Sequence, residues 1–260
     1  MRTRLSHNET MSKDRIFVDE KSGDEPFRFD ESVAEVFPDM LRRSIPGYAA
    51  SLETIGTLAR RYVQPGTACY DLGCSLGAAT LAMRHGIRAP GCRIVAIDNA
   101  PAMIDRCRRI IADDTAARRD AVPVDVVLGD LEETDIADAS MVVMNYTLQF
   151  VAAAERDAVV RRISDGLLPG GLLVLSEKIL DENARMESLL VDLYHEYKRR
   201  NDYSALEIAR KRAALENVLV PETLATHRKR LSRAGFADVA VWLRFFNFVS
   251  IIAIKPGGPA

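Results

Sequence analysis

The chain has 260 residues, of which 48% are hydrophobic, and this is enough to bury one substantial core in a single α/β domain. Its formal net charge of −2 gives no overall attraction for a polyanion, so tight unaided binding of nucleic acid is not expected. No apolar run approaches the roughly 20 residues that cross a bilayer, and the polar N-terminal residues lack the apolar core of a secretion signal. We therefore expect no membrane contact and a cytoplasmic location.

Neither the cysteines nor the histidines form a pattern that holds a metal ion. The 4 cysteines stand singly, without CxxC spacing, and the 4 histidines include no HExxH arrangement. We expect reduced thiols and no dedicated metal site.

The first part of the chain divides into a polar leader and two helices. Residues 1–28 show neither helical nor strand periodicity, which predicts a flexible leader, and residues 29–260 then form a single domain. From Asp30 apolar residues recur at helical spacing until Pro46-Gly47-Tyr48 interrupts them. A second helix, with Leu52, Ile55, Leu58 and Ala59 on one side, precedes the first strand.

A strand–helix alternation follows, as in parallel βαβ units. Strands are predicted at 68–72, 93–97, 124–128, 141–144 and 172–175, with helices at 78–85 and 101–111. The turn Pro169-Gly170-Gly171 leads into the fifth strand. Because these strands are apolar along their length, we expect helices on both faces of the sheet.

The alternation then gives way to a helical insertion at about 181–220. Its first helix carries an apolar stripe, which is either core or the face for a dimer or another partner: Met186, Leu189, Leu190, Leu193, Tyr194 and Tyr197. A second helix is expected at 204–218 and a third at 224–234. Strands at 239–243 and 246–254 are joined by Arg244-Phe245, which suggests antiparallel pairing. The predicted fold is a doubly wound, mostly parallel seven-stranded sheet with an antiparallel C-terminal strand pair and extra helices.

The loop Tyr70–Gly77 is the first candidate for a binding site. Asp71-x-Gly73-x-x-x-Gly77 joins a strand to a helix, where free backbone N–H groups can bind the polar end of a ligand. The pattern alone does not separate a structural turn from a nucleotide site. Ser75 stands where the dinucleotide fingerprint has its second glycine, so the loop is more similar to the first motif of class I methyltransferases.

Other strand ends add to this candidate. Asp98 ends the second strand and is placed to accept hydrogen bonds from both hydroxyls of a ribose. Gly129-Asp130 would read an adenine edge, and Asn145 ends the fourth strand. Asp98 and Asp130 could instead be helix caps, a position that aspartate favours. Together these residues predict a crevice for a nucleotide-type cofactor at the carboxyl ends of the strands.

The sequence shows no evident general base for methyl transfer. Asn145-Tyr146-Thr147-Leu148 differs from the Asn/Asp-Pro-Pro-aromatic motif of amine methylation, and Cys74 is better explained as a small buried filler. Arg212 follows Ile208 by four residues, and Leu215 follows Ile208 by seven. This i, i+4, i+7 spacing places the guanidinium of Arg212 on the inward stripe. It either forms a structural salt bridge or binds a carboxylate of a ligand. Tyr48 covers the crevice or packs beside the turn.

The chain resembles the carboxy-S-adenosyl-L-methionine synthase family from about Phe29 to Ile254. The resemblance rests on four stretches: residues 33–40, 70–80, 145–150 and 215–218. It implies a class I methyltransferase-like variant of the Rossmann fold that uses S-adenosyl-L-methionine as a substrate, together with prephenate. Phenylpyruvate is released, and the departing carbon dioxide is captured on the methyl carbon. A separate enzyme then uses the product to carboxymethylate a tRNA wobble uridine. We also expect a homodimer.

The resemblance further implies ten binding positions for S-adenosyl-L-methionine: Tyr48, Gly73, Cys74, Ser75, Asp98, Asn99, Asp130, Leu131, Asn145 and Arg212. Of these, Tyr48 and Arg212 are the expected catalytic residues, and Arg212 would pair with the new carboxylate, in its own subunit or across a dimer. Arg200 and Lys178 are further candidates for the carboxylates of prephenate. Two rival functions are an ordinary methyltransferase of a small molecule or RNA and a non-enzymatic cofactor-binding accessory subunit. Arg212 argues against the first, because a neutral methyl group needs no inward guanidinium.

Overall fold

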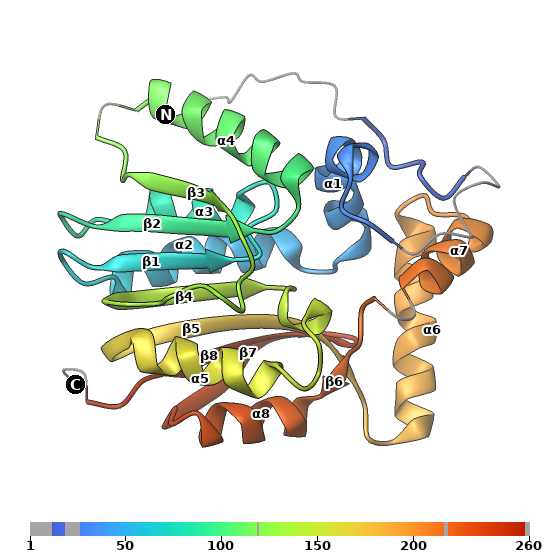
Figure 1. Ribbon diagram of the computed structural model, residues 1–260. Helices are drawn as coiled ribbons and strands as arrows, with labels where there is room; N and C mark the ends of the chain where they lie inside the picture. The colour runs from blue at the N-terminus through green and yellow to red at the C-terminus, as the bar shows by residue number, and fades with distance from the viewer. Residues whose placement is uncertain (1–11, 19–26, 119, 216–217, 258–260) are drawn as a thin grey trace, which may run out of the picture.

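The computed structural model describes residues 12–18, 27–118, 120–215 and 218–257, and a single twisted sheet forms its centre (Figure 1). Seven strands follow the order β3-β2-β1-β4-β5-β8-β7, and a two-residue strand, β6, pairs with β5. The strands are β1 (Ala68–Leu72), β2 (Arg93–Asp98), β3 (Val124–Leu128), β4 (Ala139–Asn145), β5 (Leu167–Leu180), β6 (Glu222–Thr223), β7 (Asp238–Phe245) and β8 (Phe248–Ile254). Strands β1 to β5 are parallel, whereas β8 is antiparallel to both β5 and β7. The predicted fold class is confirmed.

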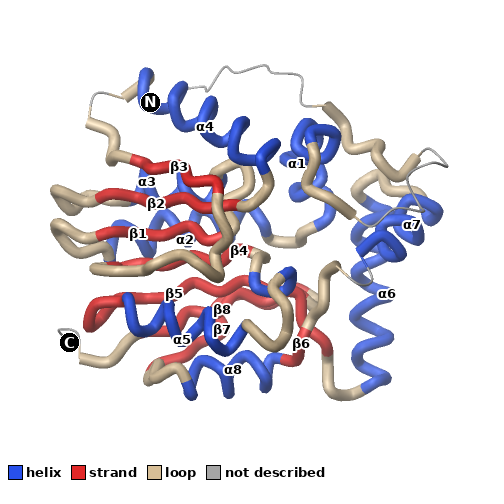
Figure 2. Tube along the Cα trace, viewed as in Figure 1, coloured by secondary structure: helices blue, strands red, loops and turns tan. Residues whose placement is uncertain are grey.

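Helices cover both faces of the sheet and its carboxyl edge (Figure 2). The helices are α1 (Glu31–Ser44), α2 (Tyr48–Tyr62), α3 (Ala78–Gly86), α4 (Pro101–Ala116), the 3-10 helix η2 (Leu148–Phe150), α5 (Arg156–Gly166), α6 (Ala184–Arg200), α7 (Ala205–Leu215) and α8 (Leu224–Arg233). Helices α2, α3 and α4 pack on one face, and α5 and α8 pack on the other. Helices α1, α6 and α7 lie beyond the carboxyl ends of the strands. Within the described ranges no helix is both long and apolar enough to cross a membrane.

Strand β4 shows why the central strands are apolar along their whole length. Met141 and Val143 pack against the α2 and α3 side, whereas Val142 and Met144 pack against the α5 and α8 side. Successive side chains point to opposite faces, and both faces are buried, so no alternation of polar and apolar residues remains.

Two strand boundaries differ from the prediction. Pro169-Gly170-Gly171 lies inside β5, because the Gly170 N–H donates to the carbonyl of Lys255 (3.0 Å) and the Lys255 N–H donates to Gly171 (2.9 Å). In the C-terminal hairpin, Arg244 and Phe245 still pair with β8, and the turn comes two residues later, with Phe246 in the left-handed region (φ 50°).

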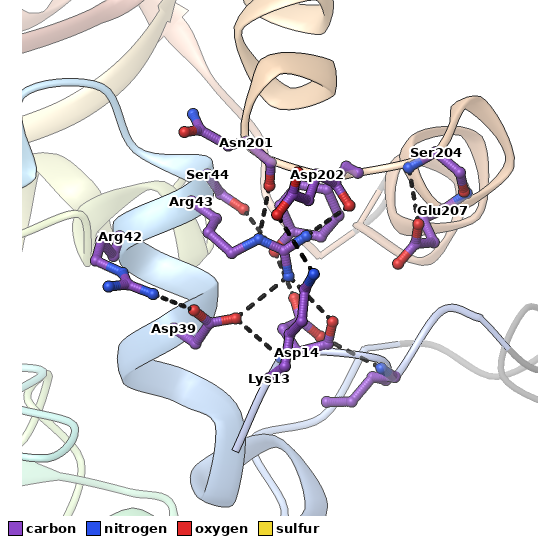
Figure 3. Close-up of polar contacts among 12 residues, drawn as sticks. Lys13, Asp14, Asp39, Arg42, Arg43, Ser44, Asn201, Asp202, Ser204 and Glu207 are labelled. Carbon is purple, nitrogen blue, oxygen red and sulfur yellow. Dashed lines mark hydrogen bonds and ion pairs between the residues drawn. The ribbon is translucent and has the colours of Figure 1, made fainter. Parts of the chain in front are cut away.

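Part of the predicted flexible leader is packed. In residues 12–18, the Asp14 N–H donates to Asp39 of α1 (2.9 Å), and its carboxylate accepts a hydrogen bond from the hydroxyl of Tyr203 (Figure 3). Arg43 of α1 donates to the Asp14 carbonyl (3.2 Å) and to the carbonyls of Asn201 and Asp202 (both 2.7 Å). These bonds tie the segment to α1 and to the α6–α7 connection, so the leader prediction fails for residues 12–18. Residues 1–11 and 19–26 lie outside the described residues.

The predicted helical insertion corresponds to α6 and α7. Of its predicted apolar stripe, Tyr194 is buried, but Met186, Leu189 and Leu193 are 43%, 49% and 38% exposed. This half of α6 therefore presents apolar side chains to solvent and is not core.

Candidate active site

A cavity of about 1100 Å³ lies at the carboxyl ends of the strands, under α1, α6 and α7. Pockets for one drug-sized ligand typically measure about 300–1,000 Å³, so this cavity has room for two small molecules side by side. It lies at the point where the strand order reverses, between β1 and β4, where open α/β sheets bind their ligands. The structure brings all ten predicted positions to its wall: Tyr48, Gly73, Cys74, Ser75, Asp98, Asn99, Asp130, Leu131, Asn145 and Arg212.

Five polar residues occupy the strand ends in sheet order. Asp130 follows β3, Asp98 ends β2, Asp71 lies near the end of β1, Asn145 ends β4 and Lys178 lies near the end of β5. Adjacent strands are roughly 4.8 Å apart, so the ends of β2 and β5 are separated by about 14 Å. The cavity is therefore acidic at the β2 and β3 end and basic at the β5 end.

The loop after β1 uses its own amides within the protein. Gly73 and Cys74 both donate to the carbonyl of Ile97 (2.8 and 2.9 Å), and Ser75 donates to the Asp98 carboxylate (2.9 Å). The predicted free N–H groups therefore do not include these three, because the loop is tied to the end of the neighbouring strand β2. Gly73 is required for a steric reason: its φ is +79°, and an added Cβ would lie 2.3 Å from Thr147.

Asp98 lines the cavity and is not the cap residue of α4, the alternative that the sequence left open. The cap residue is Ala100, and the Asp98 carboxylate accepts from its N–H (2.9 Å) in the turn that leads into the helix. Burial raises its pKa, although the backbone N–H donors oppose this. Next to it, the Asn99 amide donates to the Asp130 carboxylate (2.8 Å) and joins the ends of β2 and β3.

At the centre of the cavity, buried polar groups lack partners. Asn145 Oδ1 and the Tyr146 hydroxyl have no hydrogen-bond partner within the described part of the chain, and both residues line the cavity. Tyr146 also has a φ of 65°, a left-handed conformation that typically costs about 1–3 kcal/mol outside glycine. Unsatisfied buried polar atoms and backbone strain commonly mark a ligand site.

Asp71 contributes a buried carboxylate to the same region. Burial raises its pKa to about 6, although a hydrogen bond from the Thr80 hydroxyl (2.5 Å) favours the ionised form. Tyr48, at the start of α2, is close enough for the charge of Asp71 to add to burial in raising the tyrosine pKa. Asp71 was recognised in the sequence as part of a motif, but no binding role was predicted for it.

The inward cation of α7 is not the predicted one. Ile208, Lys211 and Ala214 are buried, whereas Arg212 is exposed at the rim of the cavity. Each residue turns a helix by roughly 100°, so an error of one residue in the phase moved the predicted charge by about that angle. The Lys211 ammonium lies 3.1 Å from the Ser44 hydroxyl and 3.9 Å from the Asp14 carboxylate. Within the described ranges Arg212 has no ion-pair partner, so the structure does not show the salt bridge that was its alternative role.

Of the two residues predicted to bind the carboxylates of prephenate, only one reaches the cavity. Lys178 lines the cavity, but Arg200 does not: its side chain is 76% exposed and pairs with Glu196 one turn earlier on α6 (2.5 Å). The residues on α6 that reach the cavity include Tyr194 and Lys198, neither of which was predicted from the sequence to be a site residue. An i, i+4 reading of α6 that counted lysine as inward-facing could have found Lys198.

A model described as a methyltransferase domain matches residues 70–171. Two relatives indicate a much narrower family than this domain model does. The carboxy-S-adenosyl-L-methionine synthase of Marinobacter nauticus is 54% identical over 93% of this chain and 95% of its own length. The synthase of the same name from Trichlorobacter lovleyi is 53% identical over 88% of this chain and 93% of its own length. The chain belongs to the carboxy-S-adenosyl-L-methionine synthase family. It is therefore an enzyme of that family, and the resemblance seen in the sequence is confirmed.

Solved structures support the fold of this family member. Human N-acetylserotonin methyltransferase in complex with SAM aligns with 93% of the chain and 58% of its own, at a TM-score of 0.59 and 19% identity. An O-methyltransferase family protein from Burkholderia thailandensis aligns with 94% of the chain and 62% of its own, at a TM-score of 0.61 and 15% identity. At this identity the likeness establishes the class I methyltransferase fold alone.

Proposed function

We propose that the enzyme converts S-adenosyl-L-methionine and prephenate into carboxy-S-adenosyl-L-methionine and phenylpyruvate. The observation that carries this proposal is the layout of the cavity, which is acidic at the β2 and β3 ends, contains Asp71 at its centre, and has Lys178 and Arg212 at the far end. A nucleoside with a cationic sulfonium fits the first two regions, and an anionic second substrate fits the third. A methyltransferase that makes a neutral product has no need of the third region.

The reaction balances without an external base. Prephenate loses its ring carboxylate as carbon dioxide and its ring hydroxyl as hydroxide, which leaves phenylpyruvate. The hydroxide takes a proton from the sulfonium methyl group and becomes water. The resulting ylide carbon forms a bond to the carbon dioxide, which gives the carboxymethyl sulfonium. This route accounts for a cavity in which no general base was evident from the sequence.

The acidic side of the site would hold the nucleoside. Asp98 is fixed by the N–H groups of Ser75 and Ala100, and its remaining lone pairs can accept from ribose hydroxyls. Asp130, fixed by Asn99, is placed for the adenine edge. The unsatisfied Oδ1 of Asn145 can accept from the amino group of the methionine part.

The protein's own contribution to the chemistry is alignment, exclusion of water and charge stabilisation. Asp71 favours a positive sulfonium because its buried carboxylate lies at the centre of the cavity. Tyr48, half-buried beside it, helps to close that part of the cavity. The guanidinium of Arg212 at the rim can donate bidentate hydrogen bonds to the carboxylate that forms on the methyl carbon.

Incubation of the enzyme with both substrates tests the reaction. We expect a cofactor species heavier by one carboxyl group in mass spectra, and ¹³C in the ring carboxylate of prephenate should appear in it. A control with phenylpyruvate and bicarbonate in place of prephenate should give no product. If the labelled substrate yields only methyl transfer or no change, the proposal is wrong.

The product would supply a separate enzyme that carboxymethylates a tRNA wobble uridine, and we place both activities in the cytoplasm. We further infer that the chain forms a homodimer, which the exposed apolar residues Met186, Leu189 and Leu193 on α6 support, because such a stripe is costly in water. Light scattering should give twice the chain mass. Leu189→Lys should shift that value toward the monomer, whereas a change at exposed Arg200 should not.

A further inference from the structure

Two lysines at the β5 end of the cavity surround one aromatic ring. The Lys178 ammonium, near the end of β5, lies 5.5 Å from the centroid of the Tyr194 ring, and the Lys198 ammonium, on α6, lies 5.1 Å from the same centroid. All three residues line the cavity. Tyr194 in turn packs edge-to-face on Phe248 of β8, with 5.0 Å between ring centroids. The site therefore joins two positive charges to an aromatic surface.

Neither of these two charges has a direct partner, although Lys198 is buried and Lys178 is half-buried. Lys198 is only 5% exposed, and neither ammonium group has a hydrogen-bond or ion-pair partner among the residues that the structure describes. A buried charge is normally paired, because its removal from water costs several kcal/mol. By contrast, Lys211, which lines the same cavity, is compensated by the Ser44 hydroxyl and the Asp14 carboxylate.

Burial is the main cause that lowers the pKa of both lysines. Burial lowers the pKa of Lys198 to about 7, and Lys211 and Lys178 add to this effect, which Asp14 opposes. Burial likewise lowers the pKa of Lys178; Arg212 adds to the effect and Glu187 opposes it. Both pKa values therefore stay below the usual value for lysine, because neither Asp14 nor Glu187 offsets the effect of burial.

We propose that Lys178 and Lys198, arranged around the Tyr194 ring, bind the carboxylates of a ring-bearing dicarboxylate, the second substrate. The proposal rests on the proposed function for the identity of that substrate as prephenate. The two ammonium groups neutralise the dianion, and the aromatic surface contacts its ring. Because β5 is about 14 Å from β2, the dicarboxylate and the nucleoside can occupy the cavity together.

Three variants test the proposal: Lys198→Met, Lys178→Met and, as a matched control, Arg200→Met. Arg200 is a cation on the same helix as Lys198, but it is exposed and already paired with Glu196. Binding of prephenate to enzyme loaded with S-adenosylhomocysteine is measured by calorimetry, and the KM for prephenate is measured in the complete reaction. Melting temperatures and affinity for S-adenosylhomocysteine show that each variant is folded.

We expect each lysine variant to weaken prephenate binding and to raise its KM at least tenfold, with the affinity for S-adenosylhomocysteine changed less than twofold. Arg200→Met should leave all three values unchanged. Wild-type enzyme should bind the monocarboxylate phenylpyruvate at least tenfold more weakly than prephenate, and inorganic phosphate at the same concentration should not displace prephenate. Unchanged prephenate binding in both lysine variants, or equally effective competition by phosphate, would overturn the proposal.

These experiments distinguish an error in the lysine site from an error in the proposed function. If the wild type makes the carboxylated product and both lysine variants keep the wild-type KM, the lysine site is wrong and the proposed function stands. If the wild type makes no such product but binds a dicarboxylate with the expected loss in Lys198→Met, the site stands and the proposed reaction is wrong. Proton uptake on binding gives a further readout, because an anion beside Lys198 raises its pKa from about 7. Uptake near pH 7.5 should disappear in Lys198→Met.

Discussion

Asp71→Asn gives the sharpest test of how the cavity recognises a cation. The substitution keeps the side-chain shape and an acceptor for the Thr80 hydroxyl, but it removes the buried charge at the centre of the site. A charge-assisted contact contributes about 1.5–3 kcal/mol, so S-adenosyl-L-methionine should bind roughly 10- to 150-fold more weakly at pH 8. An exposed carboxylate on α4, Asp105, provides the control, and Asp105→Asn should leave the affinity unchanged.

The pH dependence follows from the raised pKa of Asp71. In the free enzyme the pKa is about 6, and a bound cation favours the ionised carboxylate and so lowers it. Affinity is therefore full well above pH 6 and falls as the pH decreases through 6. About one tenth of the carboxylate is ionised one pH unit below its pKa, so the Asp71 contribution predicts a loss of roughly tenfold between pH 8 and pH 5.

Calorimetric titrations at pH 5, 6, 7 and 8 measure this effect in both proteins. Asp98 also has a raised pKa and is present in both proteins, so the difference between the two pH profiles reports Asp71 together with its charge interaction with Asp98. If the profiles of wild type and Asp71→Asn run parallel, or if the variant binds the cationic ligand more tightly, the role given to Asp71 is refuted.

Three further predictions concern the rim, the turn and a distant ion cluster. Arg212→Ala should lose carboxylation in the mass assay while it still binds S-adenosyl-L-methionine, and equal loss of both would contradict its role. Gly73→Ala should lower the melting temperature and weaken cofactor binding, because an L-residue at φ +79° is strained and its Cβ would overlap Thr147; unchanged values in both assays would show that the loop adapts. Glu222→Gln should lower the free energy of unfolding by about 1–3 kcal/mol in denaturant titrations at pH 7. Burial alone would raise the pKa of Glu222, but hydrogen bonds from Arg230 and Arg156 hold it at about 2, below its usual 4.5. The stabilisation by Glu222 is therefore present above pH 4.5 and is lost as the pH falls toward 2. If Glu222→Gln is still destabilising by the same amount at pH 2, this explanation is wrong.

The parts of the site that depend on local sequence could be predicted. A strand end, a glycine turn and a following helix lie within a few residues of each other, and parallel strands bring their carboxyl ends to one edge. Position along the chain alone therefore predicted that Asp98, Asp130 and Asn145 line the cavity, and their binding roles stay predictions. The fold class was predictable for the same reason, because the alternation of strands and helices is a local pattern repeated along the chain.

The basic end of the site could not be predicted in the same way. Lys198 and Lys211 look like ordinary lysines of solvated helices, and only the packing of α6 and α7 over the cavity buries them. Helix α7 is short and most of its apolar residues are alanines, so its phase was poorly determined and the inward charge was assigned to Arg212. The prediction of a flexible leader was wrong for residues 12–18 for a related reason, because Asp14 is fixed by Tyr203, 189 positions away in sequence.

That long-range contact has a consequence for the order in which the enzyme is assembled on the ribosome. Strands β1 to β4 and their helices are complete by residue 145, so the floor of the active site can begin to form during synthesis. The cover joins residues 12–18 and α1 to the α6–α7 connection, which emerges much later. The N-terminal segment must therefore remain without its final partners through most of translation, and the catalytic chamber closes only after its binding surface has been built.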